Sequence, residues 1–177
     1  IEYIVEEKPN DQITLSGGWG GGRLIGTLGV TFNNFSVRNF FKKEAWRPLP
    51  TGDGQRLGVS AQTNGLFYQS YNFSFTEPWL GGKKPNSLTV SVFHSLFSNG
   101  VKTKVKNAAG TKILNPDRSV MKIIGGSLGF GKRLKWPDDY FQMYTSLSYN
   151  YYDLFKYPYF ILTTGYANDI NLGLNIS

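Results

Sequence analysis

The sequence predicts an all-β protein whose strands form a transmembrane antiparallel β-barrel. Apolar and polar residues alternate with a period of two along most of the 177 residues, which gives each strand one apolar and one polar face. No run approaches the ~18 consecutive apolar residues that a membrane-spanning helix needs. Tryptophans recur in the connections next to lysine or arginine, as expected for side chains at a membrane–water interface.

The clearest strand covers residues 68–77. Its apolar positions are Tyr71, Phe73 and Phe75, and serine, asparagine and threonine occupy the positions between them. Pro78 ends the strand because proline has no N–H to donate to a neighbouring strand. Trp79, two glycines and the basic pair Lys83-Lys84 follow, which predicts a tight turn at the interface.

Seven further segments alternate in the same way. They cover residues 12–19, 23–33, 55–64, 87–97, 120–132, 141–151 and 170–176. The first of them is rich in glycine and continues into Gly20-Gly21-Gly22, a short hairpin connection. A Tyr-, Phe- and Pro-rich connection is expected to reach Asp169. Residues 1–8 also alternate, and we expect them to be the last strand of a module that precedes the barrel.

Two connections are long. Within residues 34–54 we expect one short helix over 37–46, capped by Ser36, whose aromatics among cations suit either a head-group layer or an ordinary surface loop. Residues 98–119 form the longest polar insertion and contain Lys102, Lys104, Lys106, Lys112 and Arg118.

The faces opposite the apolar ones carry Gln, Ser, Thr, Asn and Arg. A β-sandwich would tolerate these residues, but they fit the water-filled lumen of a barrel better. The residues expected to face lipid are Leu28, Val59, Phe73, Val90, Leu128 and Leu172. Because each strand reverses direction, the connections after strands two, four and six lie at one rim, and the lysine-rich insertion lies at the other. The expected interface aromatics at the first rim are Phe40, Phe41, Trp46, Trp79 and Trp136.

The formal net charge is +7, but the lysines and arginines are scattered over turns and loops, which favours lipid head groups or solvation over nucleic acid. The chain has no cysteine and one histidine, His94, whose neighbour Ser95 points to the opposite face. Ser98, in the loop beyond, stays open as a partner for His94. We expect no catalytic residue, no metal site and no cofactor, and therefore no enzyme.

Several stretches resemble the BamA-type outer-membrane insertases. The matching stretches are FSFTEPWLGG at 73–82, the Asn33-Asn34-Phe35 elbow, TGDGQRLGVS at 51–60 and DINLGLNIS at 169–177. The resemblance implies a sixteen-stranded barrel in the bacterial outer membrane, with residues 10–177 as its first eight strands. Residues 1–9 would be the last strand of a periplasmic POTRA-like module. The elbow at 36–50 is longer than in the family, and the family's sixth-loop Arg-Gly-Phe motif lies outside these residues.

The resemblance also implies a function and partners. The chain would fold and insert unfolded outer-membrane client proteins, together with accessory lipoproteins, in contact with outer-membrane lipid and lipopolysaccharide. Glycine-rich strand one would be a weak seam whose edge pairs with a client strand. That candidate edge comprises Gln12, Ile13, Thr14, Leu15, Ser16, Gly17, Gly18 and Trp19.

Two alternatives to the insertase are a self-contained eight-stranded barrel acting as anchor, adhesin or pore, and a related translocation-module barrel. The chain ends within an alternating stretch at Asn175-Ile176-Ser177. That ending and the lead-in strand favour the insertase.

Overall fold

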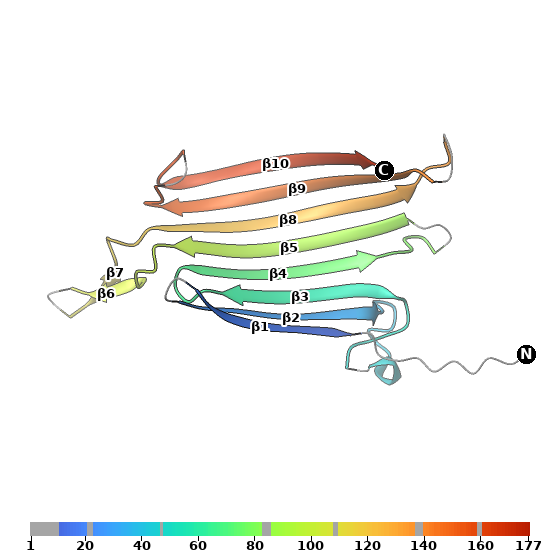
Figure 1. The fold of residues 1–177 in the computed structure, drawn as a ribbon, viewed down its shortest axis with the longest axis horizontal. Helices are drawn as coiled ribbons and strands as arrows, with labels where there is room; N and C mark the ends of the chain where they lie inside the picture. Colours follow the sequence, from blue (N-terminus) through green and yellow to red (C-terminus); the bar gives the residue numbers. More distant parts are fainter. Residues whose placement is uncertain are drawn as a thin grey trace, which may run out of the picture.

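The computed structural model describes residues 11–20, 23–46, 48–82, 86–107, 110–136, 140–158 and 161–177. Eight of its strands form one antiparallel sheet in which each strand pairs with the next along the chain (Figure 1). They are β1 (Gln12–Gly20), β2 (Arg23–Phe35), β3 (Gln55–Thr63), β4 (Tyr68–Glu77), β5 (Asn86–Ser98), β8 (Val120–Arg133), β9 (Gln142–Phe155) and β10 (Gly165–Ile176). The lead-in strand expected at residues 1–9 lies outside the described residues.

The connections separate into two rims. The long link between β2 and β3, the β4–β5 turn and the β8–β9 turn lie at one end of the sheet, which we call the tryptophan rim (Figure 1). The β3–β4 turn, the insertion between β5 and β8 and the β9–β10 link lie at the opposite end, the lysine rim. This is the division that the alternation of connections predicts.

The register keeps like residues together across the whole sheet. Leu28 of β2 lies between Leu15 and Ala61, and Leu128 of β8 lies between Val90 and Leu147. A shift of one residue would move every side chain of a strand to the other face. The observed register therefore produces one continuous apolar face and one polar face.

The apolar face is uncovered. Leu28 and Leu128 each expose 52% of their surface, although both lie at the centre of a strand. In the described ranges the buried hydrophobic side chains are Phe35, Val120 and Leu154, all of them near a rim. A water-soluble domain seldom exposes an apolar patch of this extent, so the face requires an apolar environment.

The polar face is the more crowded one. Ser70 and Ser95 are 4% and 7% exposed, and their hydroxyl oxygens lie 3.0 Å apart across β4 and β5. The hydroxyls of Ser91 and Ser127 lie 2.6 Å apart across β5 and β8. Hydroxyl pairs of this kind link neighbouring strands through side chains as well as through the backbone.

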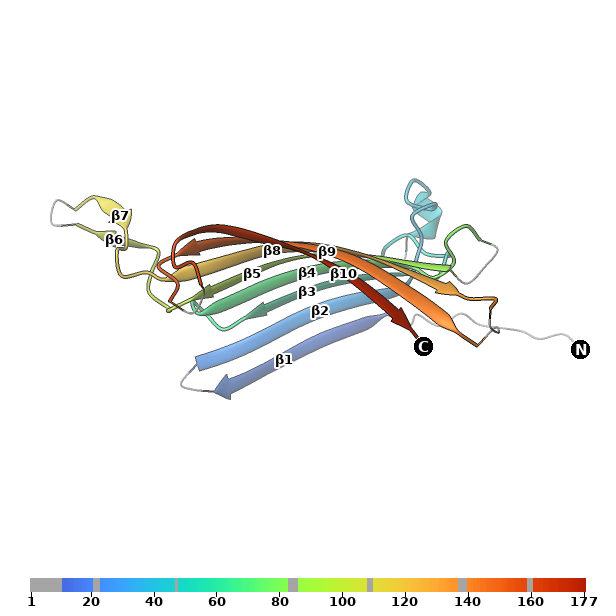
Figure 2. The ribbon, with the colours of Figure 1, turned by 90° about the horizontal axis from the view of Figure 1, so that it is seen from above.

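Glycines on β8 report how crowded each face is. A Cβ atom on Gly125 of the polar face would lie 2.4 Å from the Phe93 ring and 2.3 Å from Oδ1 of Asn150. A Cβ atom on Gly126 of the apolar face would come no closer than 3.6 Å to any atom. Side chains converge on the concave side of a curved sheet, so the polar face is the concave one. Figure 2 shows this curvature, with β1 and the end of β10 on the same side of the central strands.

The segment over residues 37–46 is not the expected helix. Its only helical part is one 3-10 turn, η1 (Lys43–Ala45), after the turns that follow Ser36. Ser36 does cap the first of these turns, because its Oγ accepts a hydrogen bond from the N–H of Asn39 at 3.1 Å. The N–H of Phe40 donates to the carbonyl of Val37 at 3.2 Å and that of Lys42 to the carbonyl of Asn39 at 2.9 Å, so the backbone closes short turns instead of a helical ladder. Tertiary bonds hold these turns, such as the one from the side-chain amide of Asn39 to the carbonyl of Thr51 at 2.8 Å. A ten-residue helix has little stability of its own, so such contacts override it.

Two other expectations need correction at the lysine rim. The insertion after β5 contains a small hairpin of β6 (Lys104–Lys106) and β7 (Lys112–Leu114), which was expected to be a loop. The link between the last two strands is also shorter than expected, since β9 extends to Phe155 and β10 begins at Gly165. Tyr152 pairs with Ala167 in this extension, where the apolar–polar alternation is weak.

No helix in the described part of the chain is long and apolar enough to cross a membrane.

Candidate functional site

Strand β1 forms one edge of the sheet. Among the described residues it pairs only with β2, from Gln12 opposite Thr31 to Gly20 opposite Arg23. Its side chains at Ile13, Leu15 and Trp19 belong to the apolar face and are each at least 75% exposed. A Cβ atom on Gly18 would meet nothing within 4 Å, and one on Gly17 would come no closer than 3.9 Å to the carbonyl of Ile25, so these two residues bring no side-chain packing to the strand.

The register fixes which amides of β1 point outward. The N–H of Asn64 donates to the carbonyl of Tyr68 at 2.8 Å, so the even-numbered residues of β3 bond toward β4. Backbone groups alternate sides along a strand, so the odd residues of β3 bond toward β2. They pair with the even residues of β2, which leaves the odd residues of β2 to bond to β1. The residues of β1 that bond to β2 are therefore Gln12, Thr14, Ser16 and Gly18.

The complementary set faces outward. The N–H and C=O groups of Ile13, Leu15, Gly17 and Trp19 point to the free side of the sheet. The eight candidate residues of the edge thus divide into two groups of four, a distinction that the sequence alone did not give.

A polar cluster at the tryptophan rim holds the ends of β2, β3 and β4 together. Ser36 is fully buried, and its hydroxyl donates to Oδ2 of Asp53 at 2.6 Å. The side-chain amide of Gln55 donates to Oε2 of Glu77 at 2.6 Å, and Oε1 of Glu77 accepts from the N–H of Trp79 at 2.9 Å. We call these residues the rim cluster.

Sequence reasoning missed the rim cluster as a unit. Asp53 and Gln55 belong to the stretch 51–60, and Glu77 belongs to 73–82, both already singled out as motifs. The signal that would have found the cluster was the placement of both motifs at strand ends on the same rim. Their polar residues then become natural partners.

The expected interface aromatics lie at the tryptophan rim. The Phe40 ring contacts those of Phe41 and Trp46, with centroids 5.5 and 5.6 Å apart, and the indole N–H of Trp46 donates to the carbonyl of Phe40 at 3.2 Å. Phe41 is 93% exposed. Trp79 and Trp136 are also exposed, but they lie on separate turns. Lys83 and Lys84 lie outside the described residues.

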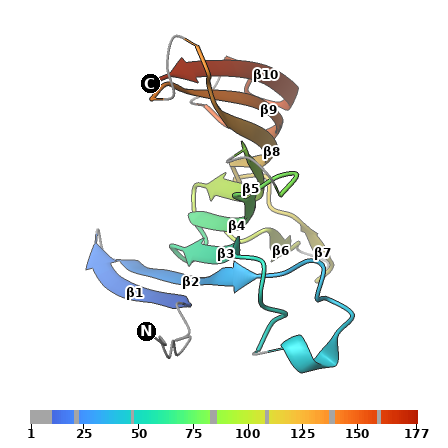
Figure 3. The same cartoon turned by 90° about the vertical axis from the view of Figure 1, so that its right-hand side faces the viewer.

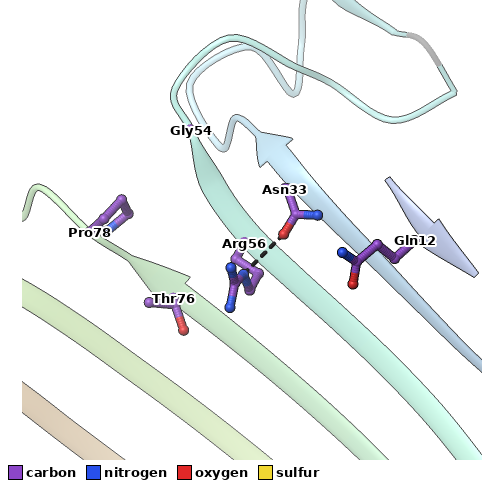
Figure 4. Close-up of a pocket in the computed structure, with 6 residues that line it drawn as sticks. All are labelled: Gln12, Asn33, Gly54, Arg56, Thr76 and Pro78. Atoms are coloured by element: carbon purple, nitrogen blue, oxygen red, sulfur yellow. Dashed lines mark hydrogen bonds between the residues drawn. The ribbon is translucent and has the colours of Figure 1, made fainter. Parts of the chain in front are cut away.

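A groove lies on the concave face beside the start of β1 (Figure 4). Its cavity volume is about 410 Å³. Within it the Nε–H of Arg56 donates to Oδ1 of Asn33 at 3.0 Å. The lining residues are Gln12, Asn33, Gly54, Arg56, Thr76 and Pro78.

The possible partnership between His94 and Ser98 does not form. The His94 ring stacks on Tyr71 across the apolar face, with centroids 6.3 Å apart. The Ser98 hydroxyl donates instead to the carbonyl of Leu66. In the described part of the chain, no three His, Asp or Glu side chains come close enough together to hold a metal ion.

Comparison with known proteins decides the family. The model of the Omp85 superfamily domain matches residues 51–175. The chain belongs to the Omp85 superfamily. Among proteins with curated descriptions no significant match was found.

A solved structure has the same fold as this Omp85 chain. The crystal structure of BamA from Haemophilus ducreyi lacking POTRA domains 1-3 matches with a TM-score of 0.52 and 20% sequence identity. The match covers 97% of this chain and 30% of that one. The chain is thus part of the barrel of an Omp85 protein in the bacterial outer membrane, with the fold of the BamA barrel. The expected family, fold class and location are confirmed, and an assembly-type barrel is supported.

The apolar face has the height that an Omp85 barrel requires. On β8, Lys122 and Lys132 lie ten residues apart in the apolar phase, and Lys122 bonds to Asp153 at 3.0 Å. Ten residues at ~3.4 Å span ~34 Å along the strand, or roughly 25 Å across a membrane at a tilt of about 40°. This equals the apolar band of about 25 Å typical of outer-membrane barrels.

Proposed function

We propose that this chain forms the first half of the barrel of an outer-membrane insertase, and that β1 receives the incoming strand of a client protein. The observation that supports this most directly is the register of β1, which directs the N–H and C=O groups of four residues away from β2, toward the strand that would close the barrel. An unpaired edge is a template for another strand. The clients would be unfolded outer-membrane proteins, delivered with the help of accessory lipoproteins.

The same proposal gives the direction of pairing. A client strand antiparallel to β1 would run from the lysine rim toward Gln12, so that its last residues reach the groove with Arg56 and Asn33. The weak packing of Gly17 and Gly18 lowers the cost of exchanging partners at this edge. Folding of the client into lipid supplies the free energy, so the step requires no nucleotide.

Two further parts of the proposal concern residues outside the described sheet. The complete barrel would have sixteen strands, and residues 1–9 would form the last strand of a POTRA-like module at the tryptophan rim. This arrangement places the tryptophan rim on the periplasmic side.

The test is a pair of proline substitutions on β1 in the complete protein. Leu15→Pro removes an outward N–H, whereas Ser16→Pro removes an N–H that bonds to β2. Proline is tolerated on an edge strand where its nitrogen faces away from the sheet. We therefore expect Leu15→Pro to fold but to assemble clients about five- to tenfold more slowly, since a ladder bond contributes about 1 kcal/mol.

The controls separate backbone from side chain. Leu15→Ala keeps the N–H and should assemble clients as the wild type does. Ser16→Pro should impair folding of the protein itself, as measured by heat-modifiable migration in gels. Normal client assembly by a folded Leu15→Pro protein would refute the docking edge and favour a barrel that acts as an anchor or pore.

A further inference from the structure

The hairpin of β6 and β7 at the lysine rim gathers positive charge on one of its faces. The register places Lys106 directly opposite Lys112, and Lys104 lies two residues away on the same face. Val105 and Ile113 pair on the other face. We call residues 101–107 and 110–118 the lysine arm.

The charge of the arm is not compensated. Like charges directly opposite on an antiparallel pair destabilise it, and the pair Lys106 and Lys112 is of this kind. No carboxylate in the described ranges lies within salt-bridge distance of these ammonium groups. At the base of the arm, by contrast, Lys122 of β8 is paired with Asp153. The ammonium groups of the arm are therefore available to an anion from outside the chain.

The base of the arm is held firmly. Arg118 is buried, and its guanidinium donates to the carbonyl of Val101 at 3.2 Å and to the hydroxyl of Thr103. The N–H of Asn115 donates to the carbonyl of Thr103 at 3.0 Å. The ammonium group of Lys156, from the β9–β10 link, donates to the carbonyl of Pro116 at 2.6 Å. These bonds fix the direction in which the arm leaves the sheet.

That direction is toward the lipid side. The arm extends beyond the strand ends and lies on the convex side of the sheet in both side views (Figures 2 and 3). The convex side carries the apolar face, so the lysines overhang lipid and not the lumen. A cationic hairpin at this position lies at the height of lipid head groups.

We propose that the lysine arm binds the phosphate groups of phosphorylated lipids in the outer leaflet of the outer membrane. Phosphate oxygens accept hydrogen bonds from ammonium groups and would remove the repulsion between Lys106 and Lys112. The placement on the convex side, next to the apolar face, favours a lipid head group over an acidic polypeptide. This inference rests on the orientation proposed above, with the tryptophan rim on the periplasmic side, but it goes beyond strand insertion and does not depend on client assembly.

The test measures binding of lipid A to the complete protein in neutral detergent. The arm variant is Lys104→Gln/Lys106→Gln/Lys112→Gln, and fluorescence titration gives its Kd for bis-phosphorylated lipid A. Each lysine near an anionic lipid surface contributes about 1 kcal/mol, so the triple change should weaken binding on the order of a hundredfold. A control with the same charge change at the tryptophan rim, Lys42→Gln/Lys43→Gln/Lys135→Gln, should bind as the wild type does.

Two further measurements identify the bound group. Removing the phosphates from lipid A should weaken its binding to the wild type at least as much as the triple substitution weakens binding of phosphorylated lipid A. Hydrogen exchange of the Val105 and Ile113 amides should slow when phosphorylated lipid A is added, and inorganic phosphate at the same concentration should have no such effect. If the triple variant does not fold, Lys106→Gln alone should weaken binding about fivefold.

Three results would overturn the proposal. They are unchanged binding by the folded arm variant, equal weakening by the control variant, and equal affinity for lipid A without phosphates. Preferential binding of an acidic polypeptide over phosphorylated lipid A would also assign the arm to a different partner.

Discussion

A lysine placed at Leu28 should destabilise the barrel far more than a lysine placed at its neighbour Thr27. Leu28 is the middle one of the five apolar-phase positions between Leu24 and Phe32. Four residues at ~3.4 Å on either side, tilted by about 40°, put it ~10 Å from each end of this band, near the bilayer centre. A charged lysine there costs about 2–4 kcal/mol. Thr27 points to the concave polar face, where the cost should stay below about 1 kcal/mol.

Urea titration of the complete protein, refolded into lipid vesicles, measures the free energy of unfolding of both variants. Leu28→Ala is the control for loss of the apolar side chain without added charge. The difference between Leu28→Lys and Thr27→Lys should exceed about 1 kcal/mol in the stated direction. Equal losses, or a larger loss for Thr27→Lys, would refute the assignment of the apolar face to lipid.

Three further predictions test other parts of the structure. Gly125→Ala should lower the free energy of unfolding by about 1–3 kcal/mol, because the added Cβ would meet side chains of the concave face. Gly126→Ala, on the open apolar face, should be neutral or stabilise by up to about 1 kcal/mol. The reverse order in the urea titration would contradict a crowded concave face. Lys104→Cys should react with an impermeant maleimide on intact cells and Lys43→Cys should not, because the two residues lie at opposite rims. Labelling of Lys43→Cys alone would mean that the tryptophan rim, and not the lysine rim, faces the cell exterior. Ser36→Ala leaves a carboxylate at the buried elbow without its hydroxyl donor and should cost about 1–3 kcal/mol, with unchanged stability as the contrary result.

The strands were predictable because their signal is local. Tyr71, Phe73 and Phe75 alternate with polar residues over a full strand, and a period of two needs no knowledge of the partner strand. The assignment of each connection to one of the two rims followed from the reversal of chain direction at every strand. In the same way Pro78 marked the end of β4, which the structure places at Glu77.

The remaining features depend on contacts between distant residues. Asn39 lies in a segment with helical spacing, yet its carbonyl closes a short turn with Lys42 and its side chain bonds to Thr51, 12 residues away. Tyr151 and Tyr152 both lie within β9, but consecutive aromatics hide the alternation that would have extended the strand. The free amides of β1 required the register of β2 and β3, which the sequence does not specify. The roles of the β1 edge and of the interface aromatics stay predictions.

The glycines of β8 have a consequence for the shape of the complete barrel. Gly125, Gly129 and Gly131 are all in the polar phase of this one strand, and each leaves room for a side chain of a neighbouring strand. Glycine in a strand permits a tighter local bend than any other residue. With three such glycines, β8 is expected to bend more sharply than β3 or β10, where Gly58 and Gly173 are the glycines of this kind. The cross-section of the complete barrel would then have a corner at β8, and larger residues there would widen it.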